Sequence, residues 1–328
     1  MTKSNTLKAS APQRSAHDAL VHVTAEITRL LEQGVMPWRA PWDRNRALAA
    51  TPGLPLRCNG QPYRGANVPL LWAAQIARGH AKRTWLTYRQ ALELGGQVRK
   101  GEKACPVVYY GQAMAKHGSG DTADTSGGND EARRYRFLKL FHVFNVEQID
   151  NLPTGFGAEI APKTPPQSML NAWIARSGAK VRVGGAMAYY SPATDTIHMP
   201  ALEAFVSAEQ ETATRLHELV HFTGHPSRLD RLQNYASDRR ARSREELTAE
   251  IGSAMLGAMI GLPPDHLEDH AAYCASWLNV IRDEPRAFFS AGAKAQAAID
   301  WLIAKAGSPK KPASIFRAFR AWRRRPRG

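Results

Sequence analysis

The segment HELVH, residues 217–221, constrains this chain more than any other stretch. In an α-helix, positions i and i+4 lie on one face, so His217 and His221 can direct both imidazoles at one metal ion. Ser207 is suited to begin the helix and Gly224 to end it. The apolar residues around the histidines favour a buried helix, in which the imidazoles need partners. The segment therefore predicts a zinc site, since Zn²⁺ accepts imidazole nitrogen and leaves a position open for water.

Glu218 follows the first histidine directly. A carboxylate at this place would lie beside the water and act as a general base. His225 is also four residues from His221, but it follows Gly224 and precedes a proline. We therefore expect His225 to support a ligand side chain or to cap the helix, and not to be a ligand itself.

A third ligand is expected from the segment RSREELTAEIGSAML, which reads as a helix and contains Glu245, Glu246 and Glu250. Glu246 and Glu250 share a face at i and i+4, beside small residues that allow another helix to approach. Paired glutamates usually mark a solvated face, but the apolar residues of this segment favour partial burial. Either glutamate can be the ligand on this evidence.

The charge is distributed unevenly. The chain of 328 residues has a net charge of +15. Residues 1–153 contain about 21 Lys and Arg against 12 Asp and Glu, whereas residues 154–304 are close to neutral. The last residues add about nine basic side chains. This pattern favours an acidic partner for the N-terminal part, and nucleic acid first.

Aromatic and basic residues alternate in the same basic region, a mixture typical of proteins that bind single-stranded nucleic acid. Rings stack on unpaired bases and cations follow the backbone. Trp and Tyr are more often core residues, so the local charge carries part of this interpretation. The expected contacts are Trp38, Arg39, Trp42, Tyr63, Arg64, Lys82, Arg83, Trp85, Tyr88, Arg89, Arg99, Lys100 and Lys103.

The periodicity predicts helices at 20–33, 69–78, 87–94, 168–177, 203–224, 244–260, 268–282 and 285–306, strands at 107–110 and 137–145, and a hairpin at 188–200.

We expect a disordered tail at 1–15, a DNA-binding domain at 16–153 with a mobile loop at 113–133, a linker at 154–166, a metal-binding domain at 167–306 and a basic tail at 307–328. Three scattered cysteines and the absence of a signal sequence or membrane span predict a cytoplasmic protein.

HELVHFTGHPSRLDR followed by REELTAEIGSAML resembles the zincin-like metallopeptidase domain of ArdC-type antirestriction proteins and of phage polyvalent proteins. The resemblance implies a gluzincin site with Glu246 as the ligand and Glu250 as the acid that supports a histidine, although the two could exchange roles. It further implies that Tyr189, Tyr190 and the strand ending at Pro200 form the edge of the cleft.

MPWRAPW, NGQPYRGANVPLLW, TWLTYRQALELGGQVRKGEKACPVVYY and FHVFNVEQIDNLP resemble the N-terminal domain of the same family, which binds single-stranded DNA. The implied fold is α+β, with a mixed N-terminal domain and a mostly helical C-terminal domain that contains a small sheet.

The implied function is that of an antirestriction protein of a plasmid or other mobile element. It would bind single-stranded DNA and protect incoming DNA during conjugation. It would hold one Zn²⁺ per chain, or another divalent ion such as Mn²⁺, and a host restriction component is a candidate protein substrate. A DNA-localised zinc protease, or a DNA-binding module with a structural metal, are the alternatives.

Overall fold

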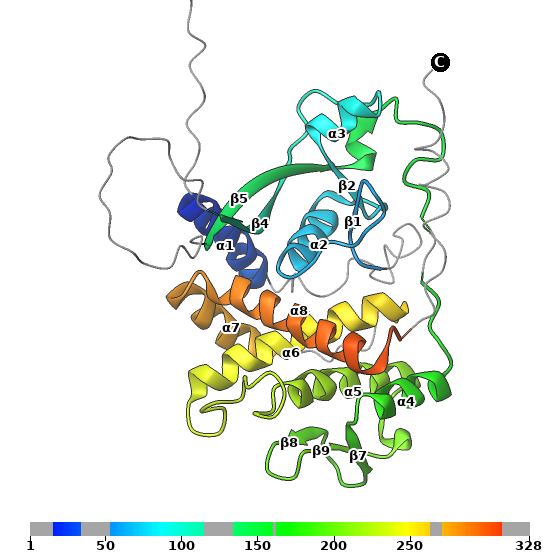
Figure 1. Ribbon diagram of the computed structural model, residues 1–328, viewed down its shortest axis with the longest axis vertical. Helices are drawn as coiled ribbons and strands as arrows, with labels where there is room; N and C mark the ends of the chain where they lie inside the picture. Colours follow the sequence, from blue (N-terminus) through cyan, green and yellow to red (C-terminus); the bar gives the residue numbers. More distant parts are fainter. Residues whose placement is uncertain (1–15, 34–52, 115–133, 160–161, 263–270, 310–328) are drawn as a thin grey trace, which may run out of the picture.

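The computed structural model describes residues 16–33, 53–114, 134–159, 162–262 and 271–309. It has the expected α+β architecture, with a mixed N-terminal part and a largely helical C-terminal part that carries a small sheet (Figure 1). The predicted tails, most of the predicted loop at 113–133, and Trp38, Arg39 and Trp42 lie outside the described residues. The domain boundaries stay predictions.

The N-terminal part is built on a four-stranded sheet of order β1-β2-β5-β4. Its strands are β1 (Leu56–Arg57), β2 (Thr84–Thr87), β4 (Cys105–Met114) and β5 (Arg134–Asn145), with β1 parallel to β2 and the other pairs antiparallel. Around the sheet lie α1 (Ala16–Glu32), α2 (Asn67–Arg78), α3 (Tyr88–Glu93) and the short 3₁₀ helix η1 (Val146–Gln148). A separate pair joins β3 (Gln97–Val98) to β6 (Ile149–Asp150).

The β4–β5 hairpin is the longest paired segment. Its register runs from Cys105 opposite Val143 to Met114 opposite Arg134. The strands predicted at 107–110 and 137–145 are therefore confirmed, and both are longer than expected. Backbone pairing does not require apolar side chains, so the ladder continues into polar residues that periodicity alone assigns to a loop.

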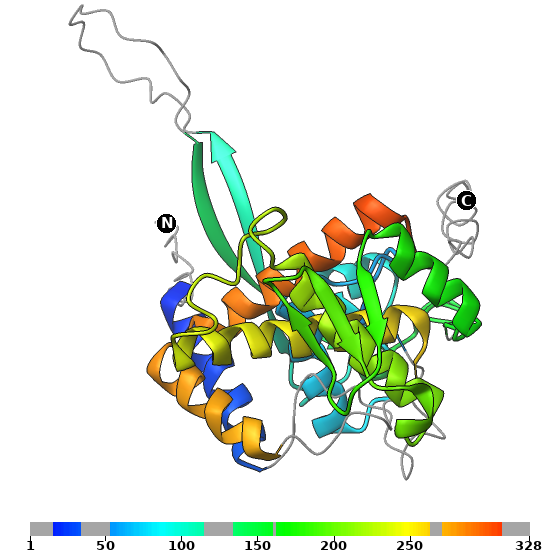
Figure 2. The ribbon, with the colours of Figure 1, turned by 90° about the horizontal axis from the view of Figure 1, so that it is seen from below.

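The C-terminal part consists of five helices and a three-stranded sheet among the described residues. The helices are α4 (Gln167–Arg176), α5 (Ala208–Thr223), α6 (Arg239–Ile260), α7 (Ala271–Asp283) and α8 (Ala287–Ala306), with the 3₁₀ helix η2 (Leu202–Ala204) before α5. The strands are β7 (Lys180–Val183), β8 (Tyr189–Ser191) and β9 (Thr196–Met199), in the order β7-β9-β8. The predicted hairpin is confirmed as β8 and β9, and β8 is an edge strand that lies along α5 (Figure 2).

One hydrophobic core extends through both parts. It includes Val23 and Leu71 of the N-terminal part together with Val220 and Leu302 of the C-terminal part. Figure 1 shows α6, α7 and α8 between the N-terminal sheet and α5. At the described end of the segment expected as a linker, the Glu159 carboxylate accepts the backbone N–H of Arg83 at 2.9 Å. The two parts are thus packed against each other and not merely connected.

None of the helices in the described ranges combines the length and the apolar character that crossing a bilayer requires.

Candidate metal centre

Helix α5 positions the HELVH residues as its sequence predicts. The Ser207 hydroxyl accepts the N–H of Gln210 at 3.1 Å and caps the first turn, and Gly224 ends the helix. His217, Glu218 and His221 face a cleft of about 640 Å³ between α5, α6 and the β8 edge. Glu218 is only 7% exposed and His221 only 5% exposed, so both lie deep in this cleft.

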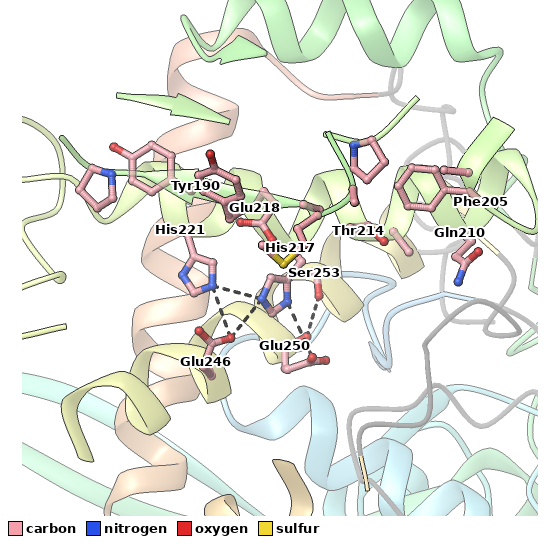
Figure 3. A pocket seen from close by; sticks show the side chains of 18 of the residues that line it. Tyr190, Phe205, Gln210, Thr214, His217, Glu218, His221, Glu246, Glu250 and Ser253 are labelled. Atoms are coloured by element: carbon pink, nitrogen blue, oxygen red, sulfur yellow. Dashed lines mark hydrogen bonds and ion pairs between the residues drawn. The ribbon is translucent and has the colours of Figure 1, made fainter. Parts of the chain in front are cut away.

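Two imidazoles and one carboxylate converge on a single point (Figure 3). His217 Nε2 lies 3.1 Å from His221 Nε2, and Glu246 Oε2 lies 3.3 Å from the first and 3.6 Å from the second. Ligand atoms bound about 2.0–2.1 Å from a tetrahedral ion are about 3.3–3.4 Å apart. The three atoms therefore fit the edges of one tetrahedral site for a divalent ion, with a fourth corner toward the cleft.

Each histidine directs its other ring nitrogen at a carboxylate. His221 Nδ1 lies 3.3 Å from Glu245 Oε1, and His217 Nδ1 lies 3.7 Å from Glu250 Oε1. Glu245 is buried and also accepts Nη2 of Arg231 at 2.9 Å. Such contacts fix the tautomer and the orientation of a ligand histidine. The supporting acid is therefore Glu245 for His221, in addition to the expected Glu250 near His217.

The carboxylates dominate the electrostatics of the site. Burial alone lowers the pKa of His221, but the hydrogen bonds with Glu245 and Glu246 outweigh burial and raise this pKa well above its usual value. Burial likewise raises the pKa of Glu246, and the hydrogen bonds with His217 and His221 outweigh it and lower this pKa. The centre thus holds negative charge that a bound cation would neutralise.

Tyr235 contributes a hydroxyl that was not among the expected site residues. Its O–H donates to Glu246 Oε1 at 2.6 Å, on the carboxylate oxygen that does not face the histidines. Burial and the negative charge of Glu246 raise the pKa of Tyr235, so the phenol is protonated at neutral pH. Tyr235 lies in the connection between α5 and α6, where no periodic pattern marks it.

The outer wall of the cleft contains the two expected tyrosines. The Tyr189 ring is exposed and stacks on His198 with 4.5 Å between centroids, and the Tyr190 hydroxyl donates to Asp195 at 2.7 Å. Other lining residues are mostly small or apolar, namely Ala186, Met187, Ala188, Pro200, Ala204, Phe205, Val206 and Ala213.

His225 makes the contacts of a capping residue, one of the two roles expected for it. His225 is not among the described residues that line the cleft. Its Nδ1 accepts the backbone N–H of Ser227 at 3.1 Å, so the ring caps the turn that follows α5.

Several residues expected to contact DNA belong instead to the core. Trp85 is fully buried on β2, and Tyr63 is 9% exposed. Arg83 is buried against Glu159, with Nε 3.4 Å from its carboxylate. A base cannot stack on a ring that has no exposed face, so these three expectations are wrong. The last two residues of the segment KRTW begin β2, an interior strand of the sheet, and Trp85 packs inward.

Other expected contacts are at the surface. Tyr88, Arg89, Arg99, Lys100 and Lys103 are exposed, Lys82 is half-buried, and Arg64 forms an ion pair with Asp300. Arg99 is paired with both Glu102 and Asp150.

The β4–β5 hairpin carries exposed aromatic rings that are not among the expected DNA contacts. Tyr109 is 53% exposed and Phe141 is 43% exposed, and their rings meet edge to face at 6.3 Å. Lys139 lies directly opposite Tyr109 in the register. We refer to Tyr109, Lys139 and Phe141 as the hairpin patch. Only the pairing of β4 with β5 brings its members together.

Comparison with protein families matches both parts of the chain. Residues 17–144 match the N-terminal domain of the anti-restriction factor ArdC, and residues 168–294 match a zincin-like metallopeptidase. The chain is 36% identical to the uncharacterized protein y4eC of Sinorhizobium fredii, over 88% of this chain and 92% of that protein. It is also 36% identical to an Escherichia coli DNA primase TraC, over 84% of this chain but only 26% of the primase.

Solved structures give the same result. The chain resembles the metal-free structure of the antirestriction protein ArdC from plasmid R388, with a TM-score of 0.73 and 40% identity over 90% of this chain and 100% of that one. The Mn(II)-bound structure of that protein gives a TM-score of 0.70 and 41% identity, over 88% and 97% of the two chains. With its fold, its convergent donor atoms and near full-length relatives in agreement, the chain belongs to the ArdC family of antirestriction proteins.

Proposed function

We propose that this protein protects the DNA of a plasmid or similar mobile element from host restriction, by binding single-stranded DNA, and that it carries a zinc-dependent peptidase site. The observation that supports the peptidase half most strongly is the set of three donor atoms beside Glu218 in an accessible cleft. A structural zinc site has four protein ligands, whereas the described residues supply three to this centre, which leaves a fourth position for water or substrate.

The ligands in this proposal are His217, His221 and Glu246, and their donor set suits Zn²⁺. Zinc bound there would polarise a substrate carbonyl and lower the pKa of water. Glu218 would take a proton from the attacking water and return it to the leaving amine nitrogen. His221 would be held in position by Glu245 and His217 by Glu250. The small and apolar cleft residues would favour a peptide of low charge.

The variant Glu218→Gln tests this assignment. It removes the base but none of the ligands, so we expect wild-type zinc content and wild-type affinity for DNA. Hydrolysis of fluorescein-labelled casein by the zinc-loaded protein should fall about 10²- to 10⁴-fold. Equal rates for the variant and the wild type would contradict the role of Glu218.

DNA binding is assigned in this proposal to the hairpin patch of the basic N-terminal part. In Figure 2 the β4–β5 hairpin extends beyond the helices, so single-stranded DNA would have access to it. Tyr109 and Phe141 offer rings for stacking, and Lys139 offers a cation to the phosphates. Similarity to DNA primases and the positive charge of the N-terminal part are consistent with this partner.

Ring removal tests the hairpin patch. Each of Tyr109→Leu and Phe141→Leu should weaken binding of an oligo-dT about 5- to 150-fold, the loss of one stacking contact of about 1–3 kcal/mol. Tyr109→Phe keeps the ring and should bind like the wild type. Affinity should fall steeply as salt is raised. Unchanged affinity in both Leu variants, or a preference for duplex, would contradict the assignment.

A DNA-localised protease is the second candidate, and the core shared by the two parts favours it, because bound DNA and the cleft would then belong to one rigid body. The number of colonies that receive the transferred DNA in a restricting host distinguishes protection by DNA binding from protection by proteolysis. Full protection by Glu218→Gln means that protection is independent of hydrolysis, and lost protection favours the protease.

A further inference from the structure

Tyr235 lies beside the reacting atoms without belonging to the ligand set. Its hydroxyl is bonded to Glu246 Oε1, while Oε2 of the same carboxylate faces His217 and His221. Its ring lies 5.8 Å from the His221 ring between centroids, and Tyr235 lines the cleft. The phenol O–H is therefore one carboxylate away from the point on which the donor atoms converge.

Peptide hydrolysis is favoured by a hydrogen-bond donor near the carbonyl oxygen of the bond that is cleaved. When water adds to the carbonyl carbon, a C–O bond forms and the π electron pair of the carbonyl moves onto its oxygen, which becomes negatively charged. Donors fixed near that oxygen stabilise the transition state more than the substrate. No Lys or Arg is among the described residues that line the cleft, so hydroxyl and amide groups are the candidates.

Arg242 holds the backbone around Tyr235, whereas the Tyr235 hydroxyl makes one hydrogen bond, to Glu246. Arg242 donates from Nε to the Tyr235 carbonyl at 3.3 Å and from Nη2 to the Ala236 carbonyl at 3.1 Å. The Arg242 guanidinium also lies 5.6 Å from the centre of the Tyr235 ring. The turn that carries Tyr235 is thus fixed independently of the phenol, and side-chain rotation is the movement by which the phenol would leave Glu246.

We propose that Tyr235 is a further catalytic residue, whose O–H leaves Glu246 when a peptide binds and donates a hydrogen bond to the carbonyl oxygen as that oxygen becomes negative. This inference rests on the proposed peptidase function. Tyr235 keeps its proton throughout: the proton lost by water goes to Glu218 and then to the amine nitrogen. Glu246 loses one hydrogen bond and keeps its place opposite the histidines.

Tyr189 is the alternative donor, because it is the exposed tyrosine among the described residues that line the cleft. Its ring is stacked flat on His198 at an interplanar angle of 7°, on the edge strand β8. Stacking holds that ring along the wall of the cleft. The comparison of Tyr235→Phe with Tyr189→Phe therefore distinguishes the two hydroxyls, since each substitution removes one oxygen and keeps the ring.

The test uses the full-length protein loaded with zinc. Tyr235→Phe should lower kcat for labelled casein about 10²- to 10³-fold with little change in KM. Zinc affinity, measured by competition with a chelating dye, should fall by about tenfold at most, because all three ligands remain and only the hydrogen bond to Glu246 is lost, so kcat is measured at saturating zinc. Tyr189→Phe should lower kcat far less than Tyr235→Phe.

A second measurement needs no turnover. The dipeptide N-phosphoryl-Leu-Trp presents a tetrahedral anion in place of the attacked carbonyl. Its affinity should fall about 10- to 100-fold in Tyr235→Phe, as expected for the loss of a hydrogen bond to a charged group. Equal affinity for the wild type and Tyr235→Phe, or a larger loss in Tyr189→Phe, would overturn the proposal. A wild type that binds this probe but cleaves no protein would count against the peptidase function alone.

Discussion

At the scale of single residues, the centre depends on acids that hold the two histidine rings. Glu245 is the most constrained of these acids, because it is buried and contacts both His221 and Arg231. Arg231 is also buried and donates from Nη2 to the Val220 carbonyl at 2.8 Å and from Nη1 to the Thr223 hydroxyl at 2.9 Å. The orientation of His221 and the end of α5 are therefore fixed by the same pair.

Glu245→Gln should lower zinc affinity about 10- to 100-fold, because the amide is a weaker acceptor for the His221 ring N–H. It should also destabilise the fold, since it leaves the buried Arg231 charge without its carboxylate. Glu250→Gln is the matched control, and its effect on zinc affinity should be smaller because its contact with His217 is longer, at 3.7 Å. Zinc titration of both variants measures this, and equal losses would contradict the special role of Glu245.

The ion pair of Asp195 with Arg228 should make the stability of the fold depend on pH. Hydrogen bonds from Arg228, which also donates to the Tyr190 hydroxyl, lower the pKa of Asp195 from 3.8 to about 2. The folded-state pKa lies below the unfolded one, so the stabilisation is present above about pH 4 and is lost as the pH falls toward 2. The urea midpoint of the wild type should fall more across this window than that of Asp195→Asn, which has no such group to protonate. If the urea midpoints of the wild type and Asp195→Asn fell equally between about pH 4 and 2, the contribution of Asp195 to stability would be contradicted.

At the scale of elements, the close approach of α5 and α6 sets the distance between the histidines and Glu246. Gly252 of α6 faces Val220 of α5, and a Cβ at Gly252 would lie 2.9 Å from a Val220 methyl carbon. Val220 is fully buried and, being β-branched, has little freedom to move. A glycine at this contact lets the two helices carry their ligands to one point.

Gly252→Ala should therefore cost about 1–3 kcal/mol of stability and weaken zinc binding, because the added methyl pushes α6 away from α5. Gly257→Ala on the same helix is the control. There the Cβ would meet Leu262 at an ordinary 3.7 Å, so stability should stay equal or rise by up to about 1 kcal/mol. Thermal unfolding and zinc titration of both variants test this, and a harmless Gly252→Ala would show that the helix spacing is not limiting.

The same elements show what the sequence could predict. HELVH determined the positions of His217, Glu218 and His221, since helical spacing follows from local geometry. The family resemblance assigned Glu246, and the atoms do converge in this way. The contacts of Glu245 and Tyr235 depend on how a connection folds back onto a helix, which no local pattern encodes. Trp85 and Tyr63 were misassigned because aromatic residues beside basic ones occur equally in a buried strand and on a binding surface.

At the scale of the whole molecule, the two family domains form one packed body. Gly292 of α8 lies so near the N-terminal part that a Cβ there would be 2.6 Å from the backbone nitrogen of Ala66. Gly65 donates its N–H to the Gln296 side chain at 3.0 Å, and Arg64 pairs with Asp300. DNA held by the basic N-terminal part would thus be fixed in orientation relative to the cleft.

If His217, His221 and Glu246 bind one catalytic divalent ion, anomalous X-ray diffraction from crystals of the full-length protein soaked in Zn²⁺ will show it. We expect one strong anomalous peak about 2.0–2.1 Å from the two Nε2 atoms and from a Glu246 oxygen, with no fourth protein ligand. A zinc peak elsewhere with this position empty, or a fourth side chain closing the site, would contradict it.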